Sequence, residues 1–259
     1  MTDPTGRHPA DPNEAAPPPD EHPGRPTDVP AERPLPELPR PYTRESMNLL
    51  EQRIKDGILR MGSMVAERHL AAVEAMETHD VDAALAVITS DESLNQEMEL
   101  VSELITTTIV KEQPVARDLR FLIALDHVAF NLERMGDHAS SVAKQARKLA
   151  PLPPLGSQER LPQLGRMVAQ QVRDVLTAVI DVDVELARAV AAKDDDVDDL
   201  YHAIFAQTIE LMQQDPANVD PGARVLFAAH YLERTGDRVT NIAEDIVFLA
   251  TGEVEDLNP

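Results

Sequence analysis

The chain has 259 residues, no cysteine, no tryptophan and a formal net charge of -22 at pH 7. Without cysteine it has neither a disulfide framework nor a thiolate metal site, and the excess of acids disfavours binding to nucleic acid. No apolar run approaches the roughly 20 residues of a membrane-spanning helix. The N-terminus has no apolar stretch behind basic residues, so secretion is not expected. Aromatic residues make up only 3% of the chain, which favours an all-α protein.

The first 42 residues are predicted to be a Pro-rich tail. Residues 1–40 hold twelve of the 21 prolines and almost no large apolar side chain. Such a segment cannot bury enough apolar surface to offset its chain entropy. We therefore predict that residues 1–42 are disordered and form a linker rather than a domain.

Three long helices are predicted in the first half, residues 43–150. Apolar residues recur at steps of three and four from Thr43, a plausible N-cap, to about His79, which is the period of an amphipathic helix. A second helix is predicted from about Val81 to Lys111, before Pro114 breaks the backbone. The third helix, about Val115 to Leu149, carries a packing seam of the antiparallel-bundle kind. Its seam residues are Leu125, Val128, Leu132, Met135, Ala139 and Val142.

The second half, residues 158–252, repeats the first. Leu132-Glu133-Arg134-Met135-Gly136-Asp137 returns 100 positions later as Leu232-Glu233-Arg234-Thr235-Gly236-Asp237. Asp91 and Asp194 are 103 positions apart, so the second copy has lost three residues between its middle and last helices. Prolines and a glycine between positions 151 and 156 mark the boundary. We predict two tandem three-helix bundles, six long helices in all, related by a pseudo-twofold axis.

Acidic residues repeated in both copies form a candidate metal site. Glu133 and Asp137 are four residues apart, as are Glu233 and Asp237, so each pair lies on one helical face. Carboxylates on the middle helices could converge with these pairs on a cation such as Mg, Mn, Fe or Zn. The rows concerned are Asp91, Asn95 and Glu99 in the first copy and Asp194, Asp198 and His202 in the second.

The acids of the last helices are expected to face outward. At about 100° per residue, Glu133 and Asp137 lie well over 90° from Leu132. The site is therefore no buried di-iron core, which would also need Glu-x-x-His on two helices. The alternative is a solvated acidic face on which Arg134 and Arg234 pair with the acids.

Two further observations bear on the site. Gly136 and Gly236 each lie inside a helix, where glycine costs about 0.5–1 kcal/mol, and close approach of another backbone is the expected reason. No phosphate-binding glycine-rich loop and no Ser-His-Asp arrangement with motif context is present. A catalytic function therefore has little support in the sequence.

The paired Leu-Glu-Arg-x-Gly-Asp stretches resemble those of the PhoU family of phosphate-transport accessory proteins, over about Thr43 to Gly252. The resemblance is strongest in the second copy. It implies two three-helix bundles that bind multinuclear iron or zinc clusters at surface carboxylates. The matching positions are Glu133, Asp137, Glu233 and Asp237, with Asp91, Asn95, Asp194 and Asp198 contributed by the middle helices. Asn95 stands where an acid is often expected, which weakens the first site.

The resemblance also implies a cytoplasmic negative regulator of phosphate uptake. When phosphate is plentiful, such a protein is expected to restrain the high-affinity phosphate ABC importer through its ATPase subunit and to hold the associated sensor histidine kinase in its non-signalling state. A homodimer is expected, and the role is that of an adaptor, not an enzyme. Two alternatives stay open: a metal-dependent enzyme acting on phosphate compounds at the same carboxylates, and a metal-free helical scaffold.

Overall fold

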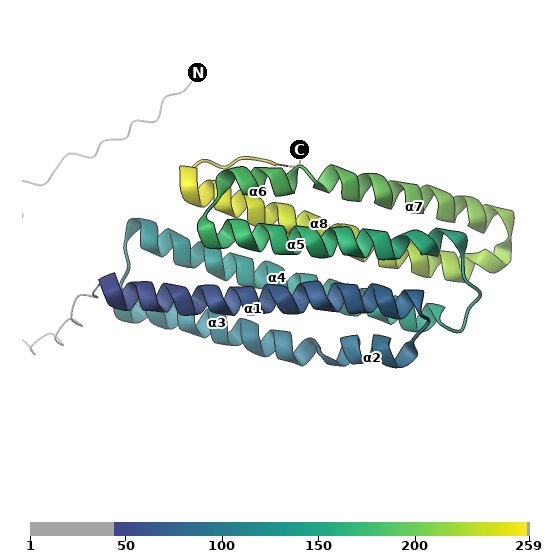
Figure 1. Ribbon diagram of the computed structural model, residues 1–259, viewed down its shortest axis with the longest axis horizontal. Helices are drawn as coiled ribbons and strands as arrows, with labels where there is room; N and C mark the ends of the chain where they lie inside the picture. The colour runs from purple at the N-terminus through teal and green to yellow at the C-terminus, as the bar shows by residue number, and fades with distance from the viewer. Residues whose placement is uncertain (1–43, 258–259) are drawn as a thin grey trace, which may run out of the picture. The chain divides into compact units, whose positions relative to one another are not determined.

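The computed structural model describes residues 44–257, whose helices are labelled in Figure 1. Over these residues the chain contains no β-strand, which confirms the all-α prediction. None of the described helices is long and apolar enough to cross a membrane. The predicted tail and the proposed N-cap Thr43 lie outside the described residues. The elements are α1 (Arg44–Glu77), α2 (Val81–Thr89), α3 (Asp91–Glu112), α4 (Ala116–Leu149), η1 (Gly156–Arg160), α5 (Leu161–Asp181), α6 (Val184–Ala191), α7 (Asp194–Gln214), η2 (Pro216–Asn218) and α8 (Val219–Thr251).

Each predicted middle helix is broken into a short and a long helix. The prediction of one helix from Val81 to Lys111 is wrong in this respect, because α2 and α3 are separated at Ser90. The Ser90 backbone has φ -74° and ψ 0°, and its hydroxyl donates to the carbonyl of Val87 at 2.8 Å. A serine hydroxyl that donates to a helix carbonyl competes with the regular backbone hydrogen bonds of the helix. The second half breaks at the equivalent residue, Lys193, between α6 and α7.

The turns before α2 and α6 are built in the same way. Asp80 and Asp183 cap these helices, each accepting from a backbone N–H three residues on, at 2.9 and 3.0 Å. The residue before each cap has a positive φ, 56° at His79 and 52° at Val182. Side-chain caps of this kind define helix N-termini. Their recurrence at equivalent positions confirms the duplication read from the sequence.

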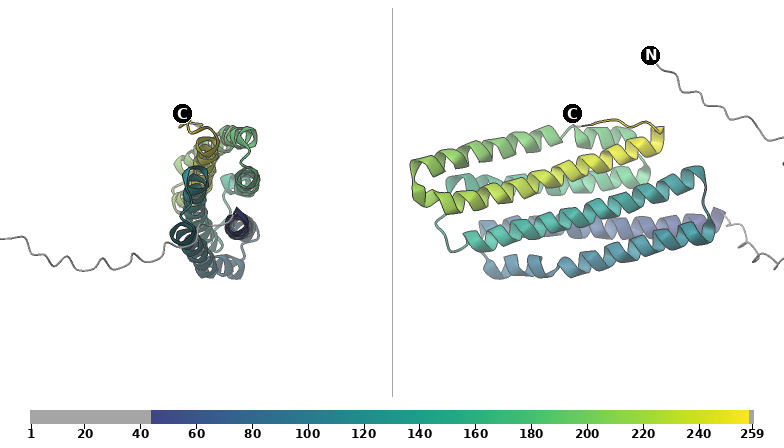
Figure 2. Two further views of the ribbon diagram at one scale, coloured as in Figure 1. Left: turned by 90° about the vertical axis from the view of Figure 1, so that its left-hand side faces the viewer. Right: turned by 180° about the vertical axis from the view of Figure 1, so that it is seen from behind.

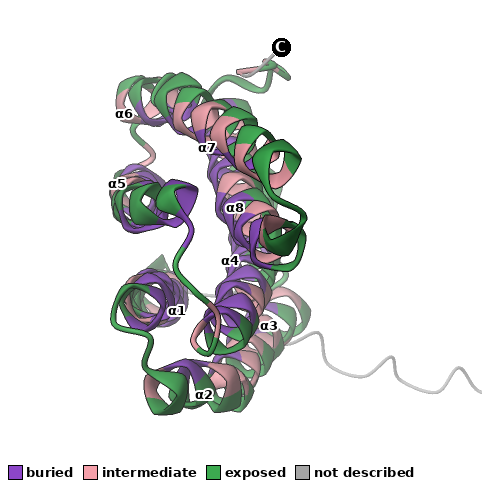
Figure 3. Cartoon of the chain, turned by 90° about the vertical axis from the view of Figure 1, so that its right-hand side faces the viewer, coloured by how far each residue is buried: buried purple, intermediate pink, exposed green. Residues whose placement is uncertain are grey.

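The two halves lie side by side with their long helices antiparallel. Figures 2 and 3 show α1 beside α5 and α4 beside α8, with α2, α3, α6 and α7 toward the outside. Gly62 on α1 packs against Leu176 on α5, whereas Val73 on α1 packs against Gly165. Residue numbers therefore rise along one helix as they fall along the other, as the predicted pseudo-twofold requires.

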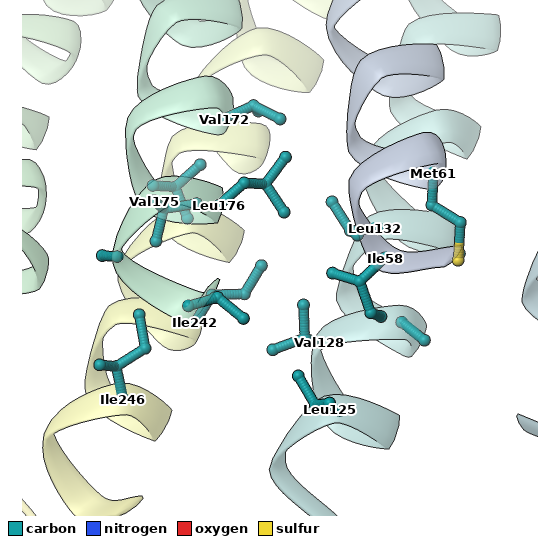
Figure 4. Close-up of a cluster of buried hydrophobic side chains, with 14 of the residues drawn as sticks. Ile58, Met61, Leu125, Val128, Leu132, Val172, Val175, Leu176, Ile242 and Ile246 are labelled. Carbon is teal, nitrogen blue, oxygen red and sulfur yellow. The ribbon is translucent and has the colours of Figure 1, made fainter. Parts of the chain in front are cut away.

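The hydrophobic core is shared between the halves. The seam predicted on α4 is buried from Leu125 to Val142. One cluster packs α1 and α4 residues against α5 and α8, as Figure 4 shows for Ile58, Val128, Leu176 and Ile242. A second cluster combines the other ends of the same four helices. The described residues therefore form one compact unit, and the predicted boundary near residue 151 falls in the loop between α4 and η1.

A buried polar contact also joins the halves. His69 on α1 is fully buried; its Nδ1 donates to the Val65 carbonyl at 2.9 Å, and its Nε2 lies 3.0 Å from Oγ1 of Thr235 on α8. His138 on α4 lies 3.3 Å from the same hydroxyl. Burial lowers the pKa of His69 to about 4 and that of His138 to about 3. Both rings are therefore neutral at pH 7.

Candidate functional site

In the second copy, the four predicted acids come together where α7 begins beside the middle of α8. Asp194 is the first residue of α7 and is only 2% exposed. Asp198 follows one turn later, and Glu233 and Asp237 lie one turn apart on α8. Burial, followed by repulsion from Asp237, Asp198 and Asp194, raises the pKa of Glu233. The acids are thus close enough to repel one another, and the metal site that the sequence indicates at these residues stays a prediction.

Negative charge on this cluster is energetically unfavourable. Burial is the main cause that raises the pKa of Glu233 to about 7, followed by repulsion from Asp237. Burial and then repulsion from Asp198 raise the pKa of Asp194 to about 6. Oε2 of Glu233 is buried and has no hydrogen-bond partner, although Nδ1 of His230 lies 3.3 Å away. A cation among these oxygens would relieve both the repulsion and the unsatisfied acceptor.

The two helix glycines make room for side chains, not for another backbone as expected. A Cβ on Gly236 would lie 2.5 Å from Oδ1 of Asp194. A Cβ on Gly136 would collide with Leu94 and lie 3.2 Å from Nη1 of Arg68. In the second copy the absent side chain therefore admits the candidate ligand Asp194, and in the first copy it admits a leucine and an arginine.

The first copy has the same scaffold but carries its own cation. Arg68 on α1 is only 6% exposed; its Nη2 donates to Oδ1 of Asp91 at 2.5 Å and to Oγ of Ser140 at 2.8 Å. The equivalent residues of the second copy are Gln171 and Thr240, which donate to Asp194 at 3.5 and 3.2 Å. A neutral amide thus replaces the guanidinium in the second copy. Asp91 therefore contacts a buried guanidinium, whereas Gln171 and Thr240 bring neutral donors to Asp194.

The remaining acids of the first copy lie beside Arg134, although Oε2 of Glu133 is buried without a hydrogen-bond partner. Arg134 donates to Asp137 at 3.2 Å, and its Nε lies 3.5 Å from Oε2 of Glu133. The Glu133 side chain is 20% exposed, less than its predicted outward position implied, and burial raises its pKa. Asn95 contributes a neutral amide. Among the described residues, Arg234 forms no ion pair with the second acidic pair, so the alternative of an arginine-paired face describes the first copy better than the second.

The second copy is the better match to a metal centre. Within residues 44–257, no three His, Cys, Asp or Glu side chains are already arranged to hold a metal ion, so ligation would require side chains to turn. The second copy offers four oxygen-donor carboxylates, a donor set that hard and borderline cations accept. An unsatisfied Oε2 occurs in both copies, on Glu133 and on Glu233. In the first copy, the guanidinium of Arg68 already neutralises Asp91.

Sequence reasoning missed the residues that distinguish the copies. Arg68 and Gln171 lie on the first helix of each half, 103 positions apart, and the same alignment pairs their neighbours. Both interrupt an otherwise apolar seam and both are buried. A position-by-position comparison of the two copies, extended to these polar residues, would have identified them.

Comparison with known proteins shows which family has this architecture. The model of the PhoU domain matches residues 58–146 and 161–246, one stretch in each half. The chain is 34% identical over 202 residues to the phosphate-specific transport system accessory protein PhoU homolog of Clostridium acetobutylicum, covering 78% of this chain and 92% of that protein. The homolog from Streptococcus pneumoniae TIGR4 is 30% identical over 215 residues, covering 83% of this chain and all of that protein.

Solved structures agree. The crystal structure of PhoU from Pseudomonas aeruginosa superposes with a TM-score of 0.76 at 30% identity, covering 80% of this chain and 100% of that one. The phosphate transport system regulatory protein PhoU from Streptococcus pneumoniae gives a TM-score of 0.76 at 29% identity, with 81% and 99% covered. The duplicated helical halves, the repeated acidic motif and these similarities show that the chain belongs to the PhoU family.

Proposed function

We propose that this protein is a cytoplasmic negative regulator of phosphate uptake and of phosphate-starvation signalling. In this proposal it acts as an adaptor that contacts the ATPase subunit of the high-affinity phosphate ABC importer and the associated sensor histidine kinase when phosphate is plentiful. Relatives that match most of its length carry the names of phosphate transport accessory and regulatory proteins. The observation that carries the proposal is the acidic cluster at the α7–α8 junction, on a fold where we find no nucleophile motif.

The cluster is proposed as a metal-dependent docking surface. Iron or zinc would be held by Asp194, Asp198, Glu233 and Asp237. When bound, the metal would supply positive charge that balances these carboxylates. Thr240 fixes one oxygen of Asp194, and Gly236 lets that carboxylate approach α8. These side chains would thereby set the shape and charge of the face offered to a partner.

The test compares the two copies. In the variant Glu233→Ala with Asp237→Ala, we expect loss of bound iron or zinc by elemental analysis, derepression of phosphate-starvation genes, and unchanged helicity by circular dichroism. The matched control is Glu133→Ala with Asp137→Ala, in which the metal of the second copy should remain. Unchanged metal content in the first variant would refute the metal part of the proposal.

The adaptor role is tested separately by pull-down from cells grown in phosphate-rich and phosphate-poor media. We expect the importer ATPase and the kinase to be captured preferentially from phosphate-rich cells. Sustained phosphatase turnover by metal-loaded protein, lost in the Glu233 and Asp237 variant, would instead favour an enzyme. Capture of both partners by protein that never contains metal would favour a plain helical scaffold.

A further inference from the structure

A groove between α1, α2 and the start of α3 is lined by Arg68, and we call it the Arg68 groove. Its volume is about 430 Å³, and its other lining residues include Glu67, Ala71, Val87, Ser90 and Ser93. No predicted metal ligand lines this groove. It therefore requires an explanation of its own.

The second copy contains the same groove in a smaller form. At the equivalent place, a groove of about 190 Å³ is lined by Gln171, Asp174, Lys193 and Asp196. Nζ of Lys193 donates to Oδ2 of Asp174 at 2.9 Å, so an ion pair fills the space. In the first copy, Ser90 and Ala71 occupy those two positions. The small side chains leave the first groove open beside an arginine, whereas the second is closed beside a glutamine.

Arg68 has buried donors for which no acceptor is found among residues 44–257. The residue is only 6% exposed, yet its Nε and Nη1 have no hydrogen-bond partner. Only Nη2 is used, by Asp91 and Ser140. A buried N–H without an acceptor costs about 1–3 kcal/mol, and more for a charged group. An acceptor in the groove would remove this penalty if the guanidinium turned one of these buried N–H groups toward it.

The groove also lies at the N-terminus of α3, a helix of 22 residues. Ser90 occupies the N-cap position but makes no capping hydrogen bond, because its hydroxyl donates backward to Val87. Uncapped backbone N–H groups and the helix dipole favour negative charge at such an end. This feature and the unsatisfied guanidinium are independent of each other, and both point to an anionic ligand.

We propose that the Arg68 groove binds a small oxyanion, a phosphate or a carboxylate, with the guanidinium of Arg68 as its charged donor. Planar guanidinium groups recognise both anions through paired N–H donors. Asp91 does not prevent this, because it shares only Nη2, and Glu67 is exposed at the rim. The two copies have thus diverged in the sign of the charge they accept. The proposal does not depend on the metal centre or on the regulatory role.

The probes are inorganic phosphate and succinate, titrated by calorimetry into the full-length, chelator-treated protein at constant ionic strength. Saturable binding of either one is expected. Ala71→Asp with Ser90→Lys should abolish it, because this double variant grafts the closing ion pair of the second copy onto the groove and leaves Arg68 in place. The graft should fold, since the backbone of Ser90 (φ -74°, ψ 0°) matches that of Lys193 (φ -81°, ψ -6°).

Two further variants sharpen the result. Arg68→Gln, which copies Gln171, should weaken binding by at least about tenfold through loss of a charged hydrogen-bond donor. Asp174→Ala with Lys193→Ser opens the second groove beside a neutral amide and should add no binding. Preference for phosphate or for succinate decides which oxyanion the groove takes. Binding of neither, or undiminished binding in the grafted double variant, would overturn the proposal.

Discussion

The carboxylate of Asp194 receives a 3.5 Å hydrogen bond from the amide of Gln171, at the position where Asp91 is ion-paired to the guanidinium of Arg68. Both acids begin the long middle helix of their half and accept from a hydroxyl on the last helix, and each last helix carries a glycine. The difference between Arg68 and Gln171 therefore replaces the guanidinium beside the first acid by a neutral amide beside the second.

The first prediction concerns the neutral pair. Asp91→Asn should lower the free energy of unfolding by on the order of 2–4 kcal/mol, because it leaves the buried charge of Arg68 without its partner. Chemical denaturation followed by circular dichroism measures this. The control is Arg60→Gln, which removes an ion pair whose arginine side chain is 60% exposed and should cost less than about 1 kcal/mol. Equal effects of the two variants would contradict the account.

The second prediction is that the same change at the equivalent residue has the opposite sign. Because burial and repulsion raise the pKa of Asp194 to about 6, the folded protein holds this proton more tightly than the unfolded chain does. The stability contributed by protonation is complete below pH about 4 and is lost as the pH rises through 6. Asp194→Asn should therefore stabilise the metal-free protein at pH 7.5, by on the order of 1–3 kcal/mol.

The pH dependence provides the check on this second prediction. The stability difference between Asp194→Asn and the parent should be small near pH 4 and grow toward pH 7, when both are measured by denaturation after chelation. A constant difference across that range would mean that ionisation of the Asp194 carboxylate is not the cause of the difference in stability. Gln171→Arg should stabilise the metal-free protein in the same way, by supplying the countercharge of the first copy, and should weaken metal binding.

The third prediction concerns the glycine that admits Asp194. Gly236→Ala gains helix propensity of about 1 kcal/mol, but its Cβ would lie 2.5 Å from the Asp194 carboxylate, which must then move. We expect a net loss of stability of about 1–3 kcal/mol and weaker metal binding by elemental analysis. The control is Gly156→Ala, where a Cβ would meet nothing closer than 3.8 Å. Retained metal in Gly236→Ala would show that this contact is dispensable.

The sequence predicted much of the fold because the apolar period and the internal repeat are both strong signals. The α4 seam from Leu125 to Val142 is buried as expected. The breaks at Ser90 and Lys193 were missed because neither residue is a glycine or proline. At Ser90 the side chain bonds to the Val87 carbonyl, which helical periodicity does not reveal. Periodicity also could not show that the core is shared, since the pairing of α1 with α5 depends on tertiary packing.

The site was predicted in part. Spacing and the repeat indicated the same four positions in each copy, and in the second copy these lie on the adjacent helices α7 and α8. That they bind a metal stays a prediction. Spacing could not reveal that Arg68, 23 residues before Asp91, reaches that carboxylate. A long-range ion pair of this kind depends on the crossing of two helices. The sequence repeat shows that arginine and glutamine differ at this position, but only the structure shows which carboxylate each of them contacts.

The fourth prediction concerns acid stability and the contact between the halves. Burial, reinforced by Arg68, lowers the pKa of His69 to about 4, and burial with His69, Arg234 and Arg238 lowers that of His138 to about 3. The unfolded chain therefore binds protons at a higher pH than the folded protein does. Stability from these neutral rings is complete above pH about 6.5 and is lost as the pH falls toward 4, at about 1.4 kcal/mol for each unit of pKa shift.

His69→Gln isolates this effect. At pH 7.5 the variant should be less stable than the parent, because a packed ring and its bond to Thr235 are lost. Between pH 6.5 and 4 its stability should fall less steeply than that of the parent, since one group that charges only on unfolding has been removed. The control is His79→Asn, an exposed residue with positive φ that asparagine tolerates, and its pH profile should match the parent. Parallel profiles for His69→Gln and the parent would show that the ring is already charged or solvated in the folded protein. The interpretation of His69 as a neutral contact between α1 and α8 would then be wrong.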